Sequence, residues 1–181
     1  MKKPTPFTTK SKLLQNKALL AVASVVLIVT IALAVSVKTF YPIRYESEIE
    51  TACKTYDVDK SLVTAIIKCE SSFNEQAKSN KGAIGLMQLM PSSAKWCAQK
   101  LGIEYSDEML YNPRYNINMG VYYLSYLLDK FDLNYAICAY NAGEGNVSKW
   151  LNGDGQIKFP ETRAYLYKVL RAKKIYKLLQ K

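Results

Sequence analysis

One carboxylate in this sequence stands where an apolar side chain is expected. The predicted helix from Ser61 to Glu70 carries an apolar stripe at helical spacing, made of Val63, Ile66 and Ile67, and Glu70 continues it at i+7. If Glu70 were instead frayed off the helix end, it would be an ordinary solvated acid. If the stripe faces the core, burial raises the pKa of the carboxyl, and Glu70 becomes the candidate general acid for protonating a leaving oxygen.

The composition narrows the chemistry further. The 181 residues include no histidine, which excludes Ser–His and Cys–His catalysis and removes the commonest zinc ligand. No CxxC pair occurs, so neither a zinc ribbon nor a thioredoxin-like site is indicated. We therefore expect no metal and no cofactor. The cysteines could be reduced core thiols or disulfides, and the sequence leaves both open; they are Cys53, Cys69, Cys97 and Cys138.

The net charge of +10 is concentrated at the two ends of the chain. Residues 1–40 carry +6, residues 41–160 carry −2, and residues 161–181 carry +6. The middle is therefore not a nucleic-acid-binding domain by charge. The basic end is predicted to be a helix from Pro160 to Lys181 with a solvated face; attraction to anionic wall polymers or lipid head groups is the alternative.

An uncharged apolar stretch near the N-terminus predicts a membrane anchor. Ala18 to Val37 is long enough to cross the hydrocarbon core as a helix. Five lysines precede it, which predicts that residues 1–17 are a cytoplasmic tail, residues 18–38 a single transmembrane span, and the rest lies outside the cytoplasm. A cleaved signal peptide is the alternative, because Ala32-Leu33-Ala34 resembles a cleavage site, and the domain would then be secreted.

The remainder, 45–181, is predicted to be mainly α-helical with short turns and no strand. Asp59 is a candidate N-cap, and Gly102 closes the helix that Pro91 begins. We expect helices at Tyr45–Tyr56, Ser61–Glu70, Pro91–Leu101, Pro113–Lys130, Leu133–Asn141, Glu144–Leu151 and Pro160–Lys181, with loops at 71–84 and 152–159. On the long helix, Tyr122, Tyr123 and Tyr126 are expected to be core side chains.

Five motifs in order carry a family resemblance. They are Glu70-Ser71, Gly85-Leu86-Met87-Gln88-Leu89-Met90-Pro91, Asn112-Pro113 with Asn116-Ile117 and Gly120, Ala139-Tyr140-Asn141-Ala142-Gly143, and Glu161-Thr162-Arg163 with Tyr165. Together they resemble the soluble lytic transglycosylase (SLT) domain family of the lysozyme-like superfamily, to which the goose-type lysozymes are related. The resemblance covers about residues 45–180. It implies a lysozyme-like helical fold with a groove for glycan strands, here preceded by the transmembrane helix.

The resemblance also implies roles for individual residues. Glu70 is the catalytic acid and then the base. Residues that match sugar-binding positions are Ser71, Ser79, Gln88, Met90, Tyr140, Asn141, Glu161 and Tyr165. Gly82 and Gly85 allow a close approach of backbone to a ligand. The departures are Cys69 and Cys138, which stand where aliphatic residues or alanine are usual.

The implied activity is non-hydrolytic cleavage of the β-1,4 bond between N-acetylmuramic acid and N-acetylglucosamine (MurNAc–GlcNAc) in peptidoglycan, which leaves 1,6-anhydro-MurNAc ends. Ordinary glycosidases use two carboxylates, whereas Glu75 and Glu144 are both expected to be solvated. The alternatives are a hydrolytic muramidase like the goose-type relatives, a non-catalytic glycan-binding envelope module, and a membrane structural protein with a lipid-binding tail. The expected partners are glycan strands and the bacterial cell membrane, with no nucleic acid, and the domain is expected to be monomeric.

Overall fold

The computed structural model describes residues 6–180, with the side chains of residues 14–180. The first five residues of the predicted cytoplasmic tail and residue 181 lie outside this range. The chain divides into two compact units, Met1–Pro42 and Ile43–Lys181. Within the first unit, residues Pro6–Phe40 form one helix, α1. Its segment Leu14–Phe40 has a mean hydropathy of 2.9 and is long and apolar enough to cross a membrane, which includes the predicted span.

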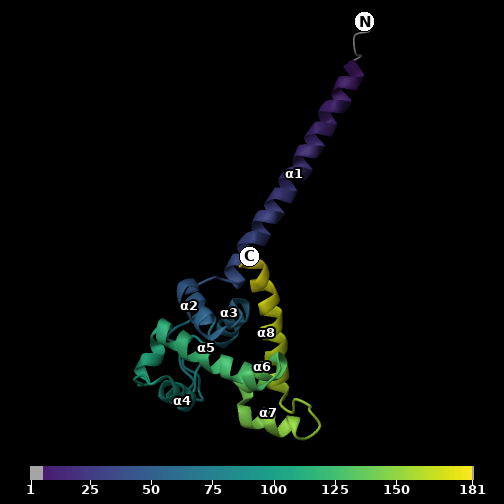
Figure 1. Ribbon diagram of the computed structural model, residues 1–181. Helices are drawn as coiled ribbons and strands as arrows, with labels where there is room; N and C mark the ends of the chain where they lie inside the picture. Colours follow the sequence, from purple (N-terminus) through teal and green to yellow (C-terminus); the bar gives the residue numbers. More distant parts are fainter. Residues whose placement is uncertain (1–5, 181) are drawn as a thin grey trace. The chain divides into compact units, whose positions relative to one another are not determined.

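The second unit is built of helices (Figure 1). Their bounds are α2 Glu46–Tyr56, α3 Lys60–Glu70, α4 Pro91–Leu101, η1 Glu108–Tyr111, α5 Pro113–Lys130, α6 Leu133–Ala142, α7 Glu144–Leu151 and α8 Pro160–Leu179. No strand occurs among residues 6–180, although two isolated bridges, Lys78 to Ile84 and Ile84 to Leu89, shape the loop before α4. The prediction of a mainly helical domain is confirmed. The short 3₁₀ helix η1 was not predicted.

The helix ends follow the local signals in the sequence. Asp59 caps α3, because its carboxylate accepts hydrogen bonds from the backbone N–H groups of Ser61 and Leu62. Asn112 caps α5 by accepting from the N–H of Tyr115, and the proline that follows occupies the first helical turn. Gly102 ends α4 in the left-handed conformation that glycine adopts without strain.

Helix α3 lies in the core of the second unit. Every side chain from Ser61 to Ile67 is buried, and α8 packs along this helix more extensively than any other element. Figure 1 shows α8 beside α3, with α5 passing through the middle of the unit. Burying a side chain such as Ile66 contributes about 2 kcal/mol. The packing therefore fixes the end of α3, where Glu70 stands.

Candidate active site

Glu70 is the last residue of α3, and its side chain is half-buried. Burial raises the pKa of its carboxyl to about 7, while a hydrogen bond from Tyr165 and the charge of Lys168 act in the opposite direction. The predicted raised pKa is therefore confirmed. At neutral pH this carboxyl is divided between a form that donates a proton and a form that accepts one.

Tyr165 supplies the hydrogen bond that holds Glu70. Its hydroxyl donates to Oε1 of Glu70 at 2.6 Å, from the face of α8 that packs on α3. The Tyr165 side chain is buried, and both burial and the neighbouring carboxylate raise its pKa well above the usual value. Tyr165 therefore stays protonated and remains a donor at all pH values of interest.

Tyr140 lies close to the same carboxyl. Burial is the main cause of its raised pKa, and the charge of Glu70 is the next. The hydroxyl of Tyr140 donates to the backbone carbonyl of Met87 at 2.8 Å, which ties α6 to the loop before α4. The structure thus brings together Glu70, Tyr140 and Tyr165 from three helices that are well separated in sequence.

Gln88 and Ser79 belong to the loop between α3 and α4, where they hold backbone groups. The Nε2 of Gln88 donates to the carbonyls of Ala77 and Gly85 at 3.1 and 2.9 Å. This leaves the carboxamide oxygen as the acceptor available to a ligand. The Oγ of Ser79 accepts from the N–H of Ala83 at 3.0 Å. Within the described part of the chain, no hydrogen bond joins either side chain to Glu70.

Asn116, on α5, holds this loop in place through hydrogen bonds. The sequence indicated no such role for it beyond its place in a motif. Its buried Nδ2 donates to the carbonyls of Ile84 and Leu110, and its Oδ1 accepts from the N–H of Met87. Gly85 leaves room for this amide: its φ is +78°, and a Cβ built there would lie 2.2 Å from Nδ2 of Asn116. At Gly85 the structure therefore shows a close approach to Asn116 and to the carbonyl of Leu110.

The other expected sugar-binding residues lie at helix ends. Met90 precedes α4 and is 41% exposed. Ser71 ends α3, with its hydroxyl donating to the carbonyl of Ile67. Asn141 is exposed on α6, and its Oδ1 accepts from the hydroxyl of Thr162. Glu161 is exposed in the first turn of α8. These four therefore do not contact Glu70 through hydrogen bonds.

The two other acids considered as partners of Glu70 are bound elsewhere. Glu75 accepts a hydrogen bond from the hydroxyl of Tyr45 at 2.9 Å. Glu144 accepts from Tyr126 and Lys130, and the bond from Lys130 is the main cause of its lowered pKa. Both acids were expected to be solvated, but in the structure both are half-buried and have hydrogen-bond partners. Among the described residues, no other carboxylate is a cause of the raised pKa of Glu70.

The site also contains features that the sequence reading missed. Lys168, expected only on the wet face of the last helix, acts on Glu70 through its charge from one turn beyond Tyr165. The expectation that Tyr122, Tyr123 and Tyr126 are core residues is wrong, because all three are only half-buried and pack around Trp96. The i, i+3 spacing of Tyr123 and Tyr126 and the aromatic residue on the preceding helix were the available signals.

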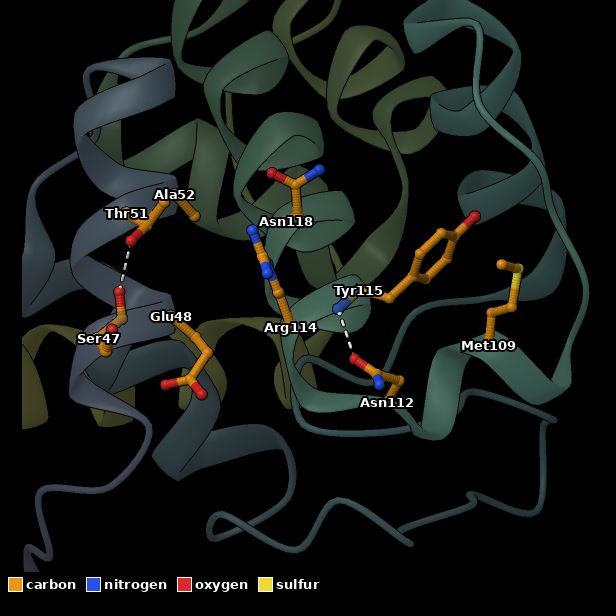
Figure 2. A pocket seen from close by; sticks show the side chains of 9 residues that line it. All are labelled: Ser47, Glu48, Thr51, Ala52, Met109, Asn112, Arg114, Tyr115 and Asn118. Carbon is orange, nitrogen blue, oxygen red and sulfur yellow. Dashed lines mark hydrogen bonds between the residues drawn. The ribbon is translucent and has the colours of Figure 1, made fainter.

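A separate hollow of about 710 Å³ opens between α2, η1 and α5 (Figure 2). Glu48 enters it from α2 and Arg114 from α5, and no ion pair joins them among residues 6–180. The hollow includes none of the residues predicted for the site. Its size alone does not make it the place of the chemistry.

The four cysteines are free thiols in the structure. Three of them are buried, and Cys69, next to Glu70, is half-buried. Burial raises the pKa of the Cys69 thiol to about 11 and that of Cys53 to about 12. Both are therefore protonated and unreactive at neutral pH.

Comparison with known proteins gives a consistent result. The family described as transglycosylase SLT domain matches residues 47–161. A soluble lytic murein transglycosylase of Salmonella typhimurium is 37% identical over 144 residues, which cover 72% of this chain and 22% of that protein. A membrane-bound lytic murein transglycosylase C of Histophilus somni is 34% identical over 170 residues, which cover 76% of this chain and 47% of that protein.

Solved structures of the same kind have the same fold. A lytic transglycosylase Slt of Pseudomonas aeruginosa superimposes with a TM-score of 0.74 and 35% identity, over 80% of this chain and 25% of that one. The 70 kDa soluble lytic transglycosylase of Escherichia coli gives a TM-score of 0.72 and 34% identity, over 77% and 25% of the two chains. The chain spans between about a fifth and a half of the length of these relatives. The expected lysozyme-like helical fold is confirmed.

Proposed function

Because this chain belongs to the transglycosylase SLT domain family, we propose that it is a peptidoglycan lytic transglycosylase in which Glu70 is the one catalytic carboxylate. Its reaction cleaves the β-1,4 bond between MurNAc and GlcNAc without water. Its relatives are named for cleavage of murein but are longer proteins, so the proposal is argued from the site of this chain.

The observation that carries the proposal is the state of Glu70. The carboxyl accepts a hydrogen bond from Tyr165 at 2.6 Å and has a pKa raised to about 7 by burial, and no second acid in the described part of the chain contributes to that shift. A two-carboxylate glycosidase needs a second acid beside the scissile bond as nucleophile or base. With one carboxylate, the nucleophile comes from the substrate itself.

The reaction then balances with Glu70 alone. The protonated carboxyl gives its proton to the glycosidic oxygen, and the bond from that oxygen to C1 of MurNAc breaks. The neighbouring N-acetyl group steadies the positive charge at C1. The carboxylate next takes the proton of the MurNAc 6-hydroxyl as O6 bonds to C1. The anhydro ring closes, Glu70 is protonated again, and no water is consumed.

The other predicted residues would place the sugars. The free oxygen of Gln88 and the side chains of Ser71, Ser79 and Asn141 offer hydrogen bonds to acetamido and hydroxyl groups. Met90, 41% exposed beside this loop, offers an apolar contact. Tyr165 positions Glu70 through its hydrogen bond, and Tyr140 lies beside the same carboxyl. Glu161 lies at the start of the same helix as Tyr165.

The first unit would hold the enzyme at the membrane. Helix α1 contains a span of 27 residues, Leu14–Phe40, that suits a bilayer in length and composition. Lysines on its N-terminal side favour a cytoplasmic N-terminus with the catalytic unit outside, where peptidoglycan is found. Removal of the helix as a signal peptide would instead release the unit as a secreted protein.

Digestion of purified peptidoglycan tests the proposal. The full chain in mild detergent is compared with Glu70→Gln and with Glu75→Gln, whose carboxylate lies in the loop after α3 and accepts a hydrogen bond from Tyr45. We expect mass spectrometry to find 1,6-anhydro-MurNAc ends with the wild type and Glu75→Gln, and at least a thousandfold less product with Glu70→Gln. Products heavier by one water would show hydrolysis, and equal product from Glu70→Gln would refute a catalytic role for this carboxyl.

A further inference from the structure

A cluster of aromatic side chains lies on α4 and α5, apart from the group formed by Glu70, Tyr140 and Tyr165. The ring of Trp96 is 4.8 Å from that of Tyr126, 6.1 Å from Tyr122 and 6.3 Å from Tyr123. All four side chains are only half-buried. Aromatic side chains of a core are normally covered, so this cluster has ring surface left for a ligand.

The surface is hollowed and has polar groups at its edge. A depression of about 280 Å³ is lined by Ser92, Ser93, Trp96, Tyr123, Tyr126 and Glu144. The carboxylate of Glu144 is fixed by hydrogen bonds from Tyr126, at 2.9 Å, and Lys130. The bond from Lys130 lowers the pKa of Glu144, so the carboxylate stays charged and is a strong acceptor at neutral pH.

The hollow shares a ring contact with a side chain beside Glu70. The ring of Tyr123, which lines the hollow, lies 5.7 Å from the ring of Tyr140. Tyr140 in turn is close enough to Glu70 for the carboxylate charge to raise its pKa. One ring contact therefore separates the hollow from the side chains around the catalytic carboxyl.

These features suit a sugar better than an apolar ligand. A pyranose has flat faces of C–H groups that pack on aromatic rings, and hydroxyls at its edge that need hydrogen-bond partners. The hollow supplies rings from Trp96, Tyr123 and Tyr126, a fixed carboxylate and two serine hydroxyls. A purely apolar ligand would displace water from the serines and from the remaining acceptor sites of Glu144 without replacing its hydrogen bonds.

We propose that the hollow between α4, α5 and Glu144 is a further glycan subsite, which binds a sugar of the strand away from the scissile bond. This inference rests on the proposed function, because the subsite would bind the same glycan strand that Glu70 is proposed to cleave. Trp96 forms the platform, and Glu144 orients the sugar through its hydroxyls. The subsite would give long strands an advantage over short fragments, since only a long strand reaches both Glu70 and Trp96.

Oligomers of N-acetylglucosamine test the subsite by binding alone. The full chain carrying Glu70→Gln is titrated by calorimetry with the trimer and the hexamer, alone and combined with Trp96→Ala. We expect Trp96→Ala to weaken hexamer binding about tenfold and to reduce the preference for the hexamer over the trimer. Unchanged hexamer affinity, or an unchanged preference between the two lengths, overturns the subsite. Tyr167→Ala is the matched control, because Tyr167 is an aromatic side chain that is 72% exposed on α8.

Fluorescence gives a readout that a purely structural role of Trp96 would not move. The chain has two tryptophans, and Trp150 is 6% exposed and packed against Phe159. With Glu70→Gln we expect the hexamer to change the emission of Trp96, and Trp96→Phe to abolish the change while preserving an aromatic ring. An equal change after Trp96→Phe contradicts the inference.

The two proposals can fail separately. If the wild type releases no anhydro product while hexamer binding still depends on Trp96, the subsite stands and the catalytic proposal is wrong. If peptidoglycan is cleaved as proposed but Trp96→Ala binds the hexamer as well as its parent does, the subsite alone is wrong.

Discussion

The hydroxyl of Tyr165 donates a 2.6 Å hydrogen bond to the carboxylate of Glu70, although the two residues are 95 positions apart in the sequence. Burial alone would raise the pKa of Glu70 further, and this bond is the first of the two influences that lower it. The value of about 7 is therefore a balance between the apolar core around α3 and a donor on α8. Each side of that balance can be changed by substitution.

Tyr165→Phe is expected to shift the pH profile to the alkaline side. Glu70 must be protonated to begin the reaction, so kcat/KM falls as the pH rises through its pKa. The hydrogen bond stabilises the charged form, and its loss raises the pKa of Glu70 above about 7. We expect the alkaline limb of the kcat/KM profile to move up by about one pH unit. Tyr167→Phe, two residues further along α8, should leave the limb in place, and a downward shift in Tyr165→Phe would contradict the balance described above.

Two glycines in one loop provide a matched test of the support from Asn116. Gly82 and Gly85 both have left-handed backbone, with φ of +88° and +78°, but a Cβ at Gly82 meets nothing within 4 Å. Gly82→Ala should therefore cost only the backbone strain, about 1–2 kcal/mol of unfolding free energy. Gly85→Ala adds a clash with Asn116 and with the carbonyl of Leu110. We therefore expect it to lower the free energy of unfolding, measured with urea, by roughly 3 kcal/mol or more. Equal losses for the two variants would show that Asn116 moves aside without cost.

Asp59 should stabilise the fold only above acid pH. Burial acts to raise its pKa, but hydrogen bonds from Lys173 of α8 and from Ser61 bring the pKa down to about 2, from an ordinary value of 3.8. A pKa lower in the folded state means stability that is present above pH 3.8 and lost as the pH falls towards 2. Because the side chain is 44% exposed, we expect Asp59→Asn to cost only about 1 kcal/mol at pH 7.

Urea unfolding at several pH values measures this contribution. The difference in unfolding free energy between wild type and Asp59→Asn should shrink between roughly pH 4 and pH 2, because the unfolded chain protonates Asp59 at a higher pH than the folded protein does. A difference that is the same at pH 7 and pH 2 would show that the charge of Asp59 does not contribute, since asparagine caps a helix as well as aspartate does.

The four thiols should resist modification until the protein unfolds. Burial is the main cause of the raised pKa of each, to about 12 for Cys53 and Cys97 and about 11 for Cys69 and Cys138. Only the thiolate reacts readily. We expect slow labelling by a disulfide reagent at pH 8 in buffer and labelling of all four in denaturant without reductant. Two or four thiols that stay unlabelled in denaturant would reveal a disulfide in the protein as purified.

The local features of the fold could be predicted because they depend on neighbouring residues. Asp59 was predicted to be a cap from its type and its position before an apolar run, and the stripe from Val63 to Ile67 predicted the inward face on which Glu70 lies. The pKa direction of Glu70 followed from that stripe. The helix η1 was missed because a single 3₁₀ turn has no periodic signal.

The partners of each site residue could not be predicted from spacing. The sequence motif marked Tyr165 and Asn141 as groove residues, but only the packing of α8 on α3 and α6 shows that Tyr165 bonds Glu70 and that Asn141 bonds Thr162. In the same way, Trp96 has no significance until α4 lies against α5. Tertiary packing decides which side chain meets which, and a pattern of residues along one helix does not contain that information.

The position of Tyr165 on α8 has a consequence for the timing of activity. A nascent chain that has left the ribosome as far as α7 already contains Glu70, but neither Tyr165 nor the Gln180 side chain that donates to Thr64 of α3 at 3.0 Å. Until α8 docks, one side of α3 is uncovered and Glu70 is solvated, with the ordinary acidity of a glutamate. Its proton would then be lost well below neutral pH. Under the proposed function, the capacity to cleave a glycan strand is therefore acquired only when α8 has packed on α3.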